Sequence, residues 1–144
     1  PEKTVAAVIA VLSPRTAWTH NIRAARDLLA LGRCTDGGVL STSIRKAQAI
    51  LASGDPESGL GGRKVRSFYA NLTGDDQAVT VDSWVVRAAG WHTDQPTARA
   101  YALISEATRR AARKYGTSPM ALQATVWVAI RDSRGSAQHG PSTH

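Results

Sequence analysis

Glycine and proline residues divide the chain into short apolar segments with helical spacing, and this pattern constrains the fold more than any other feature. In the segment 63–72, for example, Val65, Phe68, Tyr69 and Leu72 lie at i, i+3, i+4 and i+7, on one face of a helix. Glycine or proline stands close to most segment ends, where helices commonly stop or start. The pattern predicts helices over residues 4–12, 17–31, 42–53, 63–72, 83–89, 96–115 and 119–131.

These segments predict an all-α fold of six or seven helices. Val79-Thr80-Val81 alternates like a strand, but the sequence offers no second strand to pair with it, so we expect an extended lead into the next helix. The run Val5–Leu12 is apolar nearly all round, which predicts a central, buried helix. A chain of 144 residues fits one domain. We therefore predict a single helical domain over residues 1–131 and a flexible polar tail over 132–144.

Composition narrows the classes of partner and cofactor. A net charge of +7 and a pI of about 10.3 indicate an anionic partner, most commonly nucleic acid. Cys34 is the only cysteine, which excludes an internal disulfide, a cysteine zinc cluster and a four-cysteine iron–sulfur cluster. The four histidines are scattered, and no P-loop, dinucleotide fingerprint or nucleophile elbow is present. We therefore expect neither a cofactor nor a metal.

The apolar run near the N-terminus does not indicate a membrane protein. Its eight residues, Val5–Leu12, are too few to span a bilayer, and no charged leader or cleavage site accompanies them. We expect a monomeric cytoplasmic protein with no membrane partner.

A glycine-rich stretch followed by cations forms the first candidate site. Arg63, Lys64 and Arg66 occupy the first turn of the helix expected over 63–72, where the helix macrodipole disfavours positive charge. The preceding glycines Gly59, Gly61 and Gly62 would let a phosphate approach the free backbone N–H groups. The pattern favours a clamp on DNA phosphates, and the alternative is a solvated basic turn.

Asp82 is the second candidate, because it directly precedes a helix. Aspartate there is most often only an N-cap, but an ionised carboxylate in a pocket can also stabilise a sugar cation or activate water. Trp84 and Trp91 are the aromatic residues best placed to stack on a displaced base, although most tryptophans belong to a core. Arg15, in the Ser13–Thr16 break, either reaches a DNA groove or belongs to a simple helix-ending loop.

Order and spacing over about residues 5–131 resemble the helix-hairpin-helix DNA glycosylase superfamily, whose best-known member is endonuclease III. Gly59-Leu60-Gly61-Gly62-Arg63-Lys64 resembles the family's glycine-rich hairpin, which ends in a lysine. Val81-Asp82-Ser83-Trp84-Val85-Val86-Arg87 resembles the segment that carries the catalytic aspartate, and 18 residues separate Lys64 from Asp82, as in the family. Val8–Thr16 is similar to the family's early buried helix and its Leu-Ser-x-x-Thr ending.

The resemblance implies roles for individual residues. Asp82 would promote cleavage of the N-glycosidic bond of a damaged or modified nucleotide turned out of duplex DNA, as in base-excision DNA repair. Lys64 would attack the sugar carbon and add lyase activity. The hairpin glycines Gly59, Gly61 and Gly62 would offer amides to a phosphate. Arg15, Arg63, Arg66 and Arg87 would contact DNA.

The chain also departs from the family pattern. The segment before Gly59 is shorter than in typical members, the hairpin glycines align only after a shift of one residue, and Trp84 replaces a smaller or polar residue. These departures favour a divergent, compact relative of the kind that a phage encodes. Two alternatives stay open: a non-catalytic DNA-binding protein of the same fold, and a phage enzyme that modifies hypermodified thymine bases.

Overall fold

The computed structural model describes residues 1–90 and 95–138, and these residues form seven helices and no strand. The prediction of an all-α fold with six or seven helices is therefore confirmed. Contacts divide the chain into two compact units, Pro1–Asp75 and Asp76–His144, each of which is described by itself. The single domain over 1–131 stays a prediction. The backbone but not the side chain is described for a few helical residues: Ser83, Trp84, Ala88, Ile130, Arg131 and 133–138.

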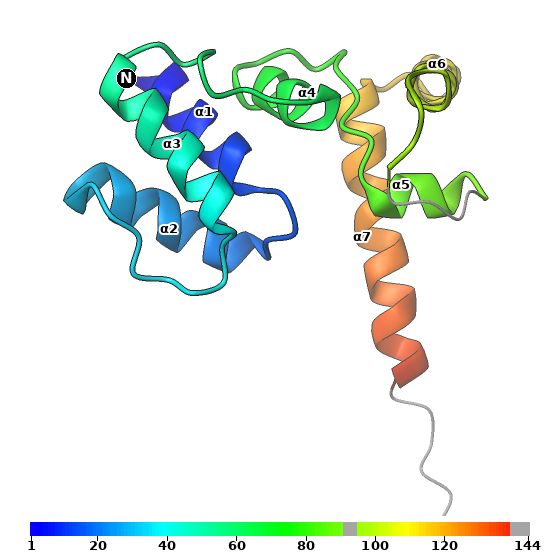
Figure 1. Cartoon of the computed structure of the whole chain (residues 1–144). Helices are drawn as coiled ribbons and strands as arrows, with labels where there is room; N and C mark the ends of the chain where they lie inside the picture. The colour runs from blue at the N-terminus through cyan, green and yellow to red at the C-terminus, as the bar shows by residue number, and fades with distance from the viewer. Residues whose placement is uncertain (91–94, 139–144) are drawn as a thin grey trace, which may run out of the picture. The chain divides into compact units, whose positions relative to one another are not determined.

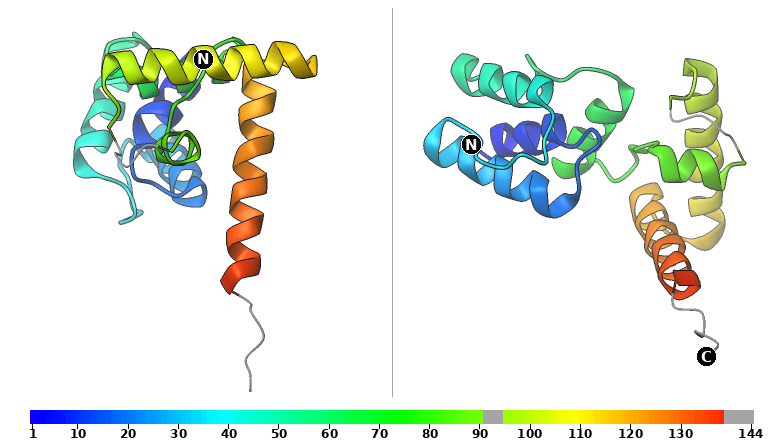
Figure 2. Two further views of the ribbon diagram at one scale, coloured as in Figure 1. Left: turned by 90° about the vertical axis from the view of Figure 1, so that its right-hand side faces the viewer. Right: turned by 60° about the horizontal axis from the view of Figure 1, so that its bottom comes forward.

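The first unit is built around its N-terminal helix. It contains α1 (Glu2–Leu12), α2 (Trp18–Leu31), α3 (Ser41–Ser53) and α4 (Arg63–Leu72). Helix α1 contacts the other three helices; Figure 1 shows it beside α3, and the right-hand view of Figure 2 shows it between α2 and α3. Val8 and Leu12 are completely buried. The expectation that this apolar helix is central and buried is confirmed.

Local signals set most helix ends in the first unit. Gly32 and Gly54 follow α2 and α3 in the left-handed conformation, both with φ of 69°, and their N–H groups close the last helical turn. The observed bounds of α4 are those that the sequence predicts. Helix α3 begins at Ser41, just before the start at Thr42 or Ser43 that the sequence predicts.

The second unit contains α5 (Ser83–Ala88), α6 (Ala98–Tyr115) and α7 (Pro119–Gln138), and α6 lies across the N-terminal end of α7 (Figure 2). Residues 78–82 belong to neither a helix nor a strand and lead into α5, and Asp82 has an extended backbone. The Tyr101 hydroxyl donates to the carbonyl of Val79 (2.9 Å) and accepts from the N–H of Val81 (3.2 Å). The small core of this unit contains four buried residues: Val79, Val81, Val86 and Ile104.

The predicted end of the last helix is wrong. Helix α7 continues past Arg131 to Gln138, so the first part of the predicted tail is helical. One glycine inside a helix costs about 1 kcal/mol but does not stop it, and the next proline is Pro141. The prediction of a flexible tail at 139–144 lies outside the described residues.

Candidate nucleic-acid interface

The glycine-rich stretch between α3 and α4 is held onto α3 by close packing. Leu60 is buried in the core of the first unit. A Cβ atom added at Gly59 would lie only 2.7 Å from Cγ1 of Ile50 and 3.0 Å from the carbonyl oxygen of Lys46. Glycine at position 59 therefore has a structural cause, the close approach of the loop to α3. Its predicted contact with a DNA phosphate stays a prediction.

The first turn of α4 places positive side chains at the positive end of the helix dipole. Gly62 is the N-cap, no side chain caps the helix, and its first turn contains no acidic residue. Arg63 and Arg66 are exposed and Lys64 is half-buried. Val65, Phe68 and Tyr69, on the opposite face, pack against the core of the unit. The packing thus directs the cationic turn away from the core.

Lys46 adds a cation from the preceding helix. A Cβ atom built at Gly61 would lie 3.4 Å from the Nζ atom of Lys46, so the ammonium group lies beside this loop. Nothing would lie within 4 Å of a Cβ atom at Gly62, which leaves the backbone at the start of α4 open. We call the following residues the basic loop surface: Lys46, Gly61, Gly62, Arg63, Lys64 and Arg66.

Two acids precede this surface in the same loop, but they do not cancel its charge. Asp55 and Glu57 are exposed, and Oδ1 of Asp55 accepts from the N–H of Glu57 at 3.0 Å, which closes a local turn. The basic loop surface carries four cations against these two acids. The arrangement can therefore bind an anion through backbone N–H groups and side chains together.

Sequence reasoning missed Lys46. The predicted helix over 42–53 contained the Arg45-Lys46 pair, but helical periodicity alone does not say which exposed residues lie beside a loop. That information comes from the packing of Ile50 and Ala47 into the core, which sets the rotation of α3.

Asp82 is the N-cap of α5. Its Oδ1 atom accepts a hydrogen bond from the N–H of Val85 at 3.0 Å, and the residue is half-buried. Among the described residues, no hydrogen-bond partner or ion pair engages Oδ2 of this carboxylate. Asp82 thus has the capping role that its position predicts.

The remaining predicted residues fall in both units. Lys64 belongs to the first unit and Asp82 to the second, so the joint site that their spacing suggests stays a prediction. Arg15 is exposed in a tight turn after α1 and has a left-handed backbone, with φ of 52°. Arg87 is exposed in the last turn of α5. The side chain of Trp84 and the whole of Trp91 lie outside the described residues.

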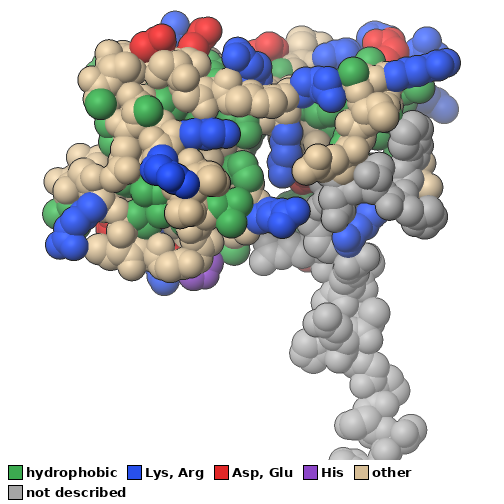
Figure 3. All heavy atoms as spheres, in the orientation of Figure 1, with side chains coloured by type: hydrophobic (Ala, Val, Ile, Leu, Met, Phe, Trp, Pro, Cys, Tyr) green, Lys and Arg blue, Asp and Glu red, His purple; other side chains and the backbone are tan. Residues whose placement is uncertain are grey.

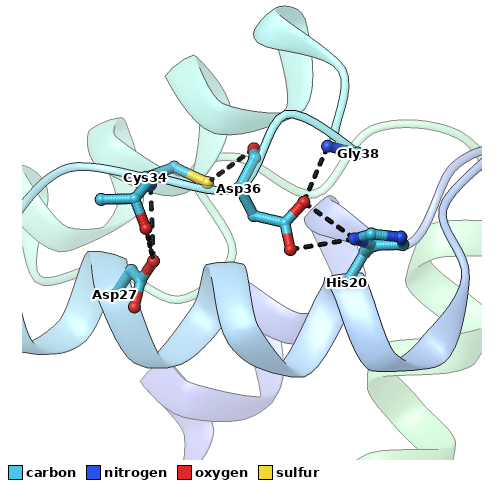
Figure 4. Close-up of polar contacts among 6 residues, drawn as sticks. His20, Asp27, Cys34, Asp36 and Gly38 are labelled. Carbon is cyan, nitrogen blue, oxygen red and sulfur yellow. Dashed lines mark hydrogen bonds and ion pairs between the residues drawn. The ribbon is translucent and has the colours of Figure 1, made fainter.

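A second polar cluster, absent from the sequence-based expectations, fixes the loop between α2 and α3 (Figure 4). Nδ1 of His20 lies 2.8 and 2.9 Å from the two carboxylate oxygens of Asp36, and Oδ1 also accepts from the N–H of Gly38 at 2.7 Å. A carboxylate only accepts, so Nδ1 carries the proton. The hydrogen bonds from His20 and Gly38 lower the pKa of Asp36 below its ordinary value.

Further bonds tie the same loop to α2. Asp27 accepts from both the hydroxyl and the N–H of Thr35, and the Cys34 thiol donates to the carbonyl of Asp36 at 3.4 Å. A Cβ atom at Gly38 would lie 2.7 Å from the His20 ring, so the ring packs directly on this glycine. These contacts explain the cluster as a clamp that fixes the loop. Sequence offered only the Asp36-Gly37-Gly38 turn as a signal.

Neither a metal-binding group nor a membrane-spanning helix is found in the described residues. Within 1–90 and 95–138, no group of three or more His, Cys, Asp or Glu side chains is arranged to hold a metal ion. No helix in the described part of the chain is both long and apolar enough to cross a membrane.

Comparison with known proteins gives a family but no function. No curated protein and no solved structure matches the chain. A family model described as "Family of unknown function (DUF7178)" matches residues 2–134, a stretch that runs across the boundary between the two units. The match covers nearly the whole sequence, and the chain therefore belongs to this family of unknown function.

Proposed function

We propose that this protein binds double-stranded DNA through the phosphate backbone, and that the basic loop surface makes the contact. One observation carries the proposal: Lys46 from α3 lies beside the same loop that leads into the uncapped, cationic first turn of α4. Cations at this end of a helix oppose the macrodipole, each by roughly 0.3–1 kcal/mol. A bound phosphate would offset that cost.

Open backbone and several positive side chains suit a phosphate better than a neutral ligand. Helix N-terminal N–H groups bind anions, and phosphate contacts position a protein on DNA without reading sequence. The overall charge of +7 adds attraction toward a polyanion at long range. The proposal therefore predicts binding with weak sequence preference and strong salt dependence.

The test is fluorescence anisotropy of a labelled DNA duplex titrated with the full chain over a range of salt concentrations. In a plot of log K for DNA binding against log[salt], the slope is negative. Replacing Lys46, Lys64 and Arg66 together by Gln should make that slope less steep by about 2–3, since each lost phosphate contact contributes roughly 0.9. A matched control replaces Lys3, Arg26 and Arg33, which are exposed and outside this surface. Equal behaviour of the two triple variants would reject the proposal.

A second candidate function, cleavage of an N-glycosidic bond in DNA, is favoured by the geometry of Asp82. The capping bond from Val85 engages one carboxylate oxygen, and the other has no partner among the described residues. A carboxylate oxygen that faces a sugar could stabilise a developing sugar cation or activate a water molecule. The resemblance of residues 81–87 to the glycosylase aspartate segment supports the same role.

The substitution Asp82→Asn separates capping from chemistry. Asparagine is as good an N-cap as aspartate, so the variant should unfold at the same temperature and bind DNA as before. Release of bases from duplexes that carry damaged or modified nucleotides should be abolished. Retained base release in Asp82→Asn would eliminate this carboxylate as the catalytic group.

Borohydride trapping of the wild type reports on Lys64, because a Schiff base to the sugar would become a permanent covalent complex.

A further inference from the structure

Helix α6 of the second unit carries a dense row of positive side chains. Five cations and one acid, Glu106, occupy its 18 residues. Arg99, Glu106, Arg110 and Arg113 are spaced at i, i+7, i+11 and i+14, so they share one face of the helix. Figure 3 shows Lys and Arg side chains on both units in the face in view. We call the following residues the α6 basic face: Arg99, Arg109, Arg110, Arg113 and Lys114.

Contacts within the unit leave most of this charge uncompensated. The Oε1 atom of Glu106 lies 3.4 Å from Nε of Arg110 and 3.3 Å from Nη2 of Arg113, so one carboxylate serves two guanidinium groups. These two arginine side chains remain 76% and 65% exposed. Arg109 donates from Nε to the carbonyl of Gln77 at 3.3 Å, which fixes its stem without neutralising it. The helix therefore presents four excess positive charges to solvent.

Helix stability explains only part of this arrangement. Arg113 and Lys114 lie in the last turn, where the macrodipole favours cations. Arg99 lies at the opposite end, where the macrodipole disfavours them. Arg110 and Lys114 are four residues apart, a spacing at which like charges destabilise a helix. A cost that Glu106 offsets only in part among the described residues points to an external anion.

We propose that the α6 basic face is a second contact surface for the phosphates of a DNA duplex. The proposal rests on the proposed function, because it takes the same ligand, the phosphate backbone of duplex DNA. The rise of an α-helix places Arg99 and Arg113 about 21 Å apart along α6. A duplex carries about 12 phosphate charges over that length. A helix with one cation in its first turn and four in its last two turns can contact phosphates toward both ends of such an array.

Two features favour a nucleic acid over an anionic membrane. A helix that binds in a membrane interface inserts its apolar face among the lipids. In α6, Ile104 is buried and Tyr101 is partly buried against Val79 and Val81 in the core of the unit, which leaves Leu103 and Tyr115 as its exposed large apolar residues. Four of the five cations are arginine, whose planar fork pairs with phosphate oxygens. The chemistry of the face therefore matches a phosphate backbone reached from solvent.

The experiment compares three variants of the full chain, each with three cations replaced by Gln: Arg99/Arg110/Arg113, Lys46/Lys64/Arg66, and the control Lys3/Arg26/Arg33. The change of net charge is the same in all three. Gln is a good helix former, and exposed ion pairs contribute little stability, so circular dichroism and thermal unfolding should match the wild type. Anisotropy with a labelled duplex is then measured from about 50 to 200 mM salt.

The α6 variant should bind the duplex at least about tenfold more weakly than the control. Its plot of log K against log[salt] should be less steep by about 2–3. If it binds like the control, the α6 basic face is not a DNA contact, whatever the loop variant does. If the loop variant binds like the control while the α6 variant weakens, the basic loop surface fails and the α6 surface stands. Stronger binding to phosphatidylserine vesicles than to the duplex, lost in the α6 variant, would overturn the assignment in favour of a membrane.

Discussion

In the first unit, three helices pack against the buried helix α1, whereas in the second unit an extended segment is held to α6 and α7 by side-chain hydrogen bonds. The Tyr101 hydroxyl bridges Val79 and Val81, and the Gln123 side-chain amide bonds to both the N–H and the carbonyl of Thr80. Among the described residues, the apolar core around α1 is much larger than the core of the second unit, which has four buried members. The first unit thus depends mainly on apolar burial, and the second relies more on a few specific bonds.

This difference bears on how each unit presents its basic surface. The basic loop surface follows from packing, because Leu60 and Gly59 fix the loop on α3. The α6 basic face needs only that the apolar face of α6 stays covered by residues 79–81. Damage to the core should therefore affect the loop surface strongly, and damage to the hydrogen bonds should affect α6.

The largest expected effect comes from the core of the first unit. Leu12→Ala removes a completely buried side chain and should lower the free energy of unfolding by roughly 2–5 kcal/mol. Val86→Ala, in the smaller core of the second unit, removes fewer atoms and should cost about 1–3 kcal/mol. Hydrogen exchange, followed separately for the peptide segments of each unit, measures the loss of stability in that unit. A larger cost for Val86→Ala would reverse the comparison.

A smaller effect is expected where the loop meets α3. Gly59→Ala places a Cβ atom 2.7 Å from the Ile50 side chain and should destabilise the first unit by about 1–3 kcal/mol, the usual range for overpacking. Gly37→Ala is the control, because nothing lies within 4 Å of a Cβ atom there. Denaturant midpoints of the two variants test the difference. If the midpoints coincide, close packing is not the reason for glycine at position 59.

The hydrogen bonds of the second unit can be tested by removing one hydroxyl. Tyr101→Phe deletes the group that bridges Val79 and Val81 and should cost about 1–2 kcal/mol, since each net hydrogen bond contributes roughly 0.5–1.5 kcal/mol. Tyr69→Phe in the first unit is the matched control, because that ring packs against the core and its hydroxyl makes no hydrogen bond with another described residue. Hydrogen exchange of residues 77–82 should increase only in Tyr101→Phe. Equal exchange in both variants would show that burial alone holds the segment.

Local signals predicted much of this structure, and long-range contacts were missed. Helix α4 was predicted with its observed bounds because glycines precede it and Gly74 follows it closely. The pairing of His20 with Asp36 joins residues 16 positions apart, and no local periodicity predicts such a contact. The position of Lys46 beside Gly61 likewise depends on how α3 packs. The end of α7 was misjudged because polar residues and one glycine did not stop the helix.

The smallest expected effect concerns acid, and it compares one carboxylate in each unit. Hydrogen bonds from His20 and Gly38 lower the pKa of Asp36 below its ordinary 3.8, and the hydrogen bond from Arg113 lowers that of Glu106 below its ordinary 4.5. When the pKa of a carboxyl group is lower in the folded state, its ionised form stabilises the fold. This stabilisation is fully present at a pH above the ordinary pKa and is lost as the pH falls through the folded-state pKa. Each contribution should therefore disappear in acid, below pH 3.8 and 4.5 respectively.

Geometry predicts that Asp36 contributes more than Glu106 to the pH dependence of the free energy of unfolding. The Asp36 side chain is 11% exposed and bonded on both oxygens, whereas that of Glu106 is 46% exposed and its ion pairs are screened by solvent and salt. Asp36→Asn should therefore flatten the acid limb of the stability curve measurably, and Glu106→Gln should change it little. Urea unfolding at a series of pH values measures both. A steeper dependence on Glu106 would mean that a surface ion pair stabilises the second unit more than the loop clamp stabilises the first.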